Sequence, residues 1–68
     1  MKVTLLNLRT GHYLQPTKNW RPGRDTALKF KSTVMAFAHA RRFRFDGVVV
    51  HLSDSPLGRN VFLPVDVS

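Results

Sequence analysis

The sequence predicts an α+β fold, with one helix packed on a small, mainly antiparallel sheet. Apolar residues over 32–43 repeat with the spacing of a helix, and neither Gly nor Pro interrupts them. Short β-branched and aliphatic runs lie on both sides of this helix and are separated by turn residues. With 68 residues, the chain is expected to form a single domain over 1–68.

Two strands joined by a tight turn are expected before the helix. The first covers 2–8 and is aliphatic on both faces, so it is either covered on both sides or bulged near its middle. Gly11 can supply a positive φ in the turn. The second strand covers 12–15 and ends at a proline.

A polar loop and a short third strand are expected next. The loop covers 16–25, and its Trp20 is expected to fold back onto the core. Over 27–30, Leu28 and Phe30 alternate with lysines, which is the period-two pattern of a strand.

The helix is expected to begin at Ser32, whose hydroxyl can accept from the first free backbone N–H groups. At about 100° per residue, one face carries small alanines and a phenylalanine and suits close packing on a sheet. That inner face comprises Ala36, Phe37 and Ala40, with Val34 and Phe43 at its edges, and the outer face comprises Met35, Ala38, His39 and Arg42.

Two further strands are expected after the helix. Gly47 is placed to adopt a left-handed conformation near the helix C-terminus. The run over 48–52 is almost continuously apolar and predicts a central strand, and 53–60 predicts a loop. Residues 61–63 predict an edge strand because Pro64 follows them. The expected core comprises Val3, Leu5, Leu28, Phe30, Ala36, Phe37, Ala40, Val48 and Val50.

The sequence contains no pattern typical of an active site. Its three histidines lack metal-ligand spacing, there is no cysteine, and the four acidic residues are scattered aspartates. The glycines are isolated, so no phosphate-binding loop is expected. We therefore expect a non-enzymatic protein with no catalytic residues, no metal and no cofactor.

The charge distribution is the strongest functional signal. The net charge is +7, and nine Lys or Arg but only one acid lie between Arg9 and Arg44. This excess indicates a polyanionic partner, and arginines among aromatic residues at 41–45 are typical of nucleic-acid contacts. An exposed Trp20 or Tyr13 could stack on a base. The candidate nucleic-acid-binding residues are Lys18, Arg21, Arg24, Lys29, Lys31, Arg41, Arg42 and Arg44.

Other interpretations of these charges remain open. A regulatory or interaction subunit that binds an acidic protein is the main alternative, and the cations can also form a solvated surface. We expect a cytoplasmic protein without a membrane segment, because no apolar run reaches about 20 residues. A homodimer through the strand at 61–63 is also expected, because a short chain without disulfides gains stability by association.

Part of the chain resembles small uncharacterised bacterial or phage-type proteins. The resemblance rests on T-G-x-Y-L at 10–14, on Trp20, and on A-x-x-F-x-S at 27–32 followed by alternate alanines. It covers about residues 3–52, and the tail after Ser53 lies outside it. It implies a hairpin, a tryptophan loop, a short strand and a helix in that order, but no activity.

Overall fold

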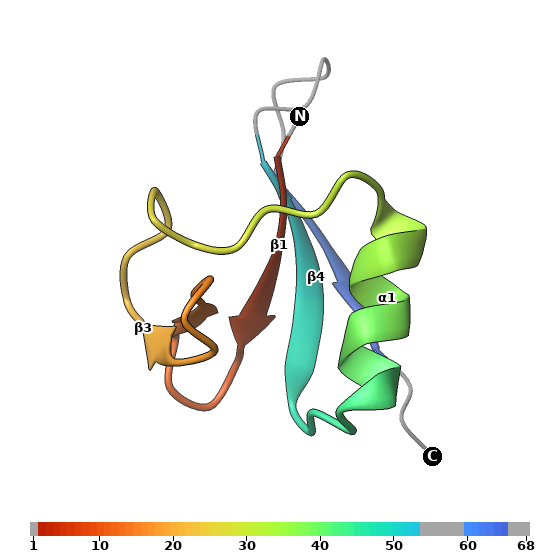
Figure 1. Ribbon diagram of the computed structural model, residues 1–68, viewed down its shortest axis with the longest axis horizontal. Coiled ribbons are helices and arrows are strands. Elements are labelled where there is room, and N and C mark those ends of the chain that lie inside the picture. Colours follow the sequence, from red (N-terminus) through yellow and green to blue (C-terminus); the bar gives the residue numbers. More distant parts are fainter. Residues whose placement is uncertain (1, 54–59, 66–68) are drawn as a thin grey trace.

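One helix packs on one face of a five-stranded antiparallel sheet, which confirms the predicted α+β fold. The structure is a computed structural model that describes residues 2–53 and 60–65, and the strand order is β3-β2-β1-β4-β5 (Figure 1). The elements are β1 (Lys2–Asn7), β2 (Tyr13–Leu14), β3 (Trp20–Arg21), α1 (Thr33–Arg42), β4 (Val48–Ser53) and β5 (Val61–Pro64). Most of the predicted 53–60 loop lies outside the described residues.

Strands β1 and β4 form the centre of the sheet. Their register is unbroken over all six residues of each strand, so β1 has no bulge. Val3 and Leu5 are buried against the helix, and Thr4 is buried on the opposite face. The first half of β1 is therefore covered on both sides, which was one of the two expected arrangements.

The helix begins as the sequence predicts. Ser32 is extended, and its Oγ accepts the backbone N–H of Met35 at 3.3 Å. Ala36 and Ala40 have no exposed surface where the helix crosses β1 and β4. Their small side chains let the helix approach the sheet closely, and Phe37 fills the flank as a half-buried residue.

The helix ends at Arg42, with Phe43 as its C-cap, which agrees with the predicted end at 43. The N–H of Phe45 donates to the carbonyl of Ala40, and the N–H of Arg44 donates to that of Arg41. These two bonds form a Schellman motif, in which the residue after the C-cap is left-handed. Arg44 occupies that position with φ 51°, whereas Gly47, with φ 70°, lies in the next turn. Gly47 thus adopts the left-handed conformation that was predicted for it, but the left-handed residue of the Schellman motif itself is Arg44, which was not predicted.

The third strand lies earlier in the chain than predicted. Trp20 and Arg21 pair with β2, in the segment that was expected to be a loop. The expected strand at 27–30 is reduced to one bridge, in which the N–H of Phe30 donates to the carbonyl of Val3. This segment continues from there to the start of α1, across the sheet in Figure 1.

The core agrees with the prediction in most positions. Six of the nine expected residues are buried, and Leu28, Phe30 and Phe37 are partly buried against them. Trp20 also packs against the core, as expected. The burial of Leu14, Ala27 and Val49 was not predicted.

Strand β5 is an edge strand, as the sequence predicts, and it pairs with β4. The N–H of Val65 donates to the carbonyl of Val48, so alternate residues direct their backbone polar groups to the outer edge of β5. Pro64 is one of these residues and has no N–H to offer there. One edge of this strand is therefore occupied by β4, and the homodimer through the strand stays a prediction.

Candidate functional site

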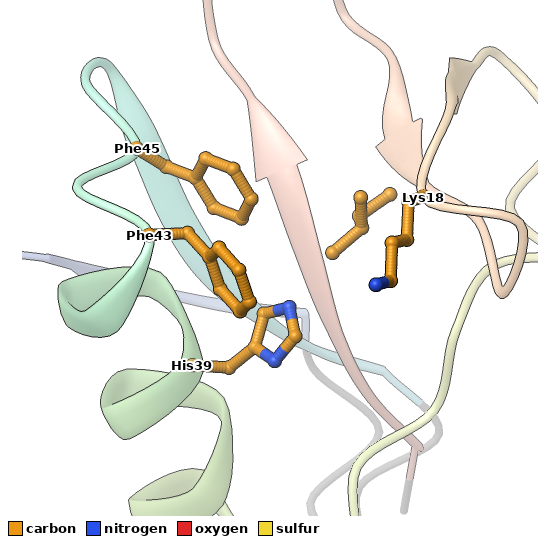
Figure 2. A pocket seen from close by; sticks show the side chains of 5 residues that line it. Lys18, His39, Phe43 and Phe45 are labelled. Atoms are coloured by element: carbon orange, nitrogen blue, oxygen red, sulfur yellow. The ribbon is translucent and has the colours of Figure 1, made fainter.

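The described part of the molecule contains a pocket between the end of the helix and the β2–β3 turn. Its volume is about 150 Å³, and it is lined by Leu14, Lys18, His39, Phe43 and Phe45. Figure 2 shows Lys18 across the pocket from the three rings of the lining. Apart from Lys18 and His39, the lining is apolar, so the pocket suits a flat, poorly hydrated group.

Aromatic rings form one wall of this pocket. The rings of Phe43 and Phe45 stack with their centroids 5.9 Å apart, and Trp20 meets Phe45 edge-on at 5.2 Å. Phe43 keeps 48% of its surface exposed. The exposed aromatic surface is thus Phe43, whereas Trp20 and Tyr13, the suggested stacking residues, are both half-buried.

His39 belongs to the same aromatic cluster. Its ring centroid lies 4.7 Å from that of Phe43, 5.3 Å from that of Phe30 and 6.0 Å from that of Phe45. The prediction that His39 lies on an outer helix face is wrong, because the segments before and after the helix bring Phe30 and Phe45 against this flank. Burial lowers the pKa of His39 from its ordinary value, and the charges of Arg42 and Lys18 lower it further.

Two cations lie at the pocket. Lys18 contributes directly to the lining, and the guanidinium of Arg42 lies 5.8 Å from the ring centroid of Phe43. Arg44 lies in the chain between Phe43 and Phe45. Of all described residues other than glycine, Lys18 (φ 70°) and Arg44 (φ 51°) are the two with positive φ. Both positions would favour glycine for stability, yet one carries a cation that lines the pocket and the other a cation that lies in the chain between two lining phenylalanines.

Two other predicted cations belong to the opposite face of the sheet. Arg21 pairs with Tyr13, whose side chain bonds His51 on the face away from the helix. Arg24 is close enough to His51 to lower its pKa. Arg21 and Arg24 therefore lie away from the pocket, and the predicted basic residues do not form one face.

The remaining three predicted cations do not line the pocket either. The ammonium of Lys29 donates to the carbonyls of Asp25 and Ala27, at 2.8 and 3.2 Å. Lys31 is exposed just before α1 and is not among the residues that line the pocket. Arg41 is exposed and lies two residues, or about 200°, around the helix from His39.

A polar cluster on the other sheet face was not predicted. His51 is only 2% exposed, and its ring stacks on that of Phe62 with centroids 4.5 Å apart. Because Asn60 Oδ1 can only accept, His51 Nε2–H donates to it at 3.4 Å, and Nδ1 accepts the O–H of Tyr13 at 3.1 Å. Thr4 Oγ1–H donates to the His51 carbonyl at 3.3 Å.

This polar cluster is consistent with a structural role. Burial lowers the pKa of His51, as does the charge of Arg24, while the bond to Asn60 acts in the opposite direction. A neutral imidazole satisfies both its donor and its acceptor here, which stabilises the packing of β4. The almost continuously apolar run at 48–52, which predicts burial on both faces, was the available sequence signal for this second buried layer.

No group of three or more His, Cys, Asp or Glu side chains within 2–53 and 60–65 is arranged to hold a metal ion. No helix in these ranges combines the length and apolar character required to span a bilayer. Comparison of the chain with protein-family models, with curated proteins and with solved structures finds no match.

Proposed function

We propose that this chain is a small non-enzymatic cytoplasmic module that binds single-stranded nucleic acid at the pocket. The observation that carries the proposal is an aromatic pocket with one cation in its lining and a second beside its Phe43 wall. An unpaired base can enter the pocket and stack on Phe43, while Lys18 and Arg42 contact the phosphates on either side. A paired base cannot do so, because its faces are covered within the duplex.

The two left-handed cations support this proposal. A non-glycine residue in this conformation costs folding free energy, and such strain is concentrated at functional sites. At Lys18 and Arg44 a glycine would remove the strain but also the charge. The presence of a lysine and an arginine at these two strained positions is explained if their charges bind a ligand.

Salt-dependent binding tests the proposal. A labelled single strand of about 10 nucleotides, within the site size of small single-strand-binding folds, is titrated at several salt concentrations. For single strands, each phosphate contact contributes about 0.7 to the slope of log K against log salt. The double variant Lys18→Gln/Arg42→Gln should therefore lower this slope by about 1.4.

A matched variant provides the control. Arg21→Gln/Arg24→Gln also removes two positive charges, so both variants change the net charge from +7 to +5. Because Arg21 and Arg24 lie away from the pocket, this variant should keep the slope of the unmodified protein. Equal slopes for the two variants would show nonspecific charge attraction. No saturable binding at about 150 mM salt would overturn the proposal in favour of an acidic protein partner.

A further inference from the structure

We infer that the pocket is selective for an unpaired pyrimidine base, an inference that rests on the proposed nucleic-acid binding. The size of the pocket is the first argument. An apolar protein cavity of about 150 Å³ is known to hold one benzene ring. The pocket here has about that volume, so it matches the single six-membered ring of a pyrimidine. A purine carries a second, fused ring, which would have to lie outside this volume, at the open side of the pocket.

The polar groups of the lining provide the second argument. Two lining residues carry N–H donors, three on the Lys18 ammonium and one on neutral His39, although most of the lining surface is apolar. Among the described residues, the ring nitrogens of His39 have no hydrogen-bond partner, and its ring packs against those of Phe30, Phe43 and Phe45. Pyrimidines carry acceptors at the ring edge, at O2 in all of them and at O4 in thymine. The pocket thus combines an apolar wall for the ring face with donors for its edge.

The third argument is charge complementarity. The lining has no acidic side chain, and Arg42 adds a further cation beside Phe43. A base reaches a protein together with its two flanking phosphates, so cations near the opening favour a nucleotide in a strand over a neutral ring. This distinguishes the pocket from a simple apolar defect in the packing.

The test places one base in an otherwise abasic strand. Oligonucleotides of equal length carry thymine, cytosine, adenine or no base at one central position. All four have the same phosphates, so they differ only in what can enter the pocket. We expect the thymine and cytosine strands to bind about 10-fold more tightly than the adenine and abasic strands, in line with the discrimination that pocket size provides. Anisotropy of a dye at the strand terminus measures the affinities.

Two exposed phenylalanines provide a matched pair of variants. Phe43 is 48% exposed in the pocket, and Phe62 is 50% exposed on the other face of the sheet. Phe43→Ala should abolish the preference for a pyrimidine, whereas Phe62→Ala should retain it. Circular dichroism shows whether each variant is folded.

The outcomes separate this inference from the proposed function. If all four strands bind equally, or the adenine strand binds as well as the thymine strand, pyrimidine selectivity is overturned while nucleic-acid binding stands. If Phe62→Ala removes the preference and Phe43→Ala does not, the base occupies the other sheet face and the inference is wrong. If no strand binds, both the inference and the proposed function fail.

Discussion

The left-handed conformation of Arg44 predicts that the helix end can be stabilised by removing a side chain. Arg44 has φ 51° at the Schellman position, where an L-residue costs about 1–2 kcal/mol relative to glycine. Glycine loses about 0.4–1 kcal/mol more chain entropy on folding, which offsets part of that gain. Arg44→Gly should therefore be more stable than Arg44→Ala by about 0.5–1 kcal/mol.

The two variants differ only in the Cβ atom, so the lost charge is the same in both. For a chain of this size, the expected difference corresponds to about 2–8 °C in melting temperature, measured by circular dichroism. Both variants should bind the single strand more weakly than the unmodified protein, and to the same extent, if the Arg44 charge is used. Equal melting temperatures for the two variants would refute the claim that the backbone at Arg44 is strained.

Three further predictions concern packing, pH and association. Ala40→Leu should destabilise the protein by about 1–3 kcal/mol, because Ala40 has no exposed surface. Ala38→Leu, at an exposed position, should change stability by less than about 0.5 kcal/mol. Equal melting temperatures for the two variants would show that the helix does not pack on the sheet through the face that contains Ala40. The pKa values of His39 and His51 are lowered from 6.5 in the folded state, so the unfolded chain binds protons first and stability should fall as the pH drops below about 6.5. Melts at pH 7.5 and at about pH 5 check this, and a higher melting temperature in acid would contradict it. The predicted homodimer should sediment at twice the mass of one chain, and a purely monomeric species at high concentration would exclude it.

Local sequence patterns correctly predicted the start of the helix, its inner face and the central strand. The N-cap at Ser32 and the inner residues Ala36 and Ala40 follow from helical spacing and capping chemistry, and all three are confirmed. The apolar run at 48–52 predicted the central strand, because a strand that is buried on both faces carries apolar residues at nearly every position. These features depend on residues close together in the sequence.

Local sequence patterns did not predict the position of the third strand. The β2–β3 hairpin is closed by two backbone hydrogen bonds. The N–H of Gln15 donates to the carbonyl of Asn19, and the N–H of Lys18 donates to the carbonyl of Gln15. Its turn requires a positive φ at Lys18, a residue type that gives no sign of such a conformation. The alternation at 27–30 is real, but Phe30 meets β1 at a single bridge and the strand ends there.

The candidate site was predicted only in part, because it is assembled from distant segments. Lys18 was named from its charge and Arg42 from the arginines interleaved with aromatic residues; in the structure Lys18 lines the pocket and Arg42 lies against the ring of Phe43. Arg21 and Arg24 were grouped with them, but the alternation of side chains in β3 and the path of the next loop place them on the other face. The role of His39 depends on rings that precede and follow the helix, which helical periodicity does not include.

The most direct test of the account is a nuclear magnetic resonance titration of the isotope-labelled protein with a short thymidine-rich single strand. If the pocket binds a base, the largest shift changes should occur at Lys18, His39, Phe43 and Phe45, with the side-chain indole N–H of Trp20 following Phe45. The signals of Tyr13 and His51, on the opposite face of the sheet, should change little. Changes centred on that opposite face, or no saturable change at about 150 mM salt, would contradict the account.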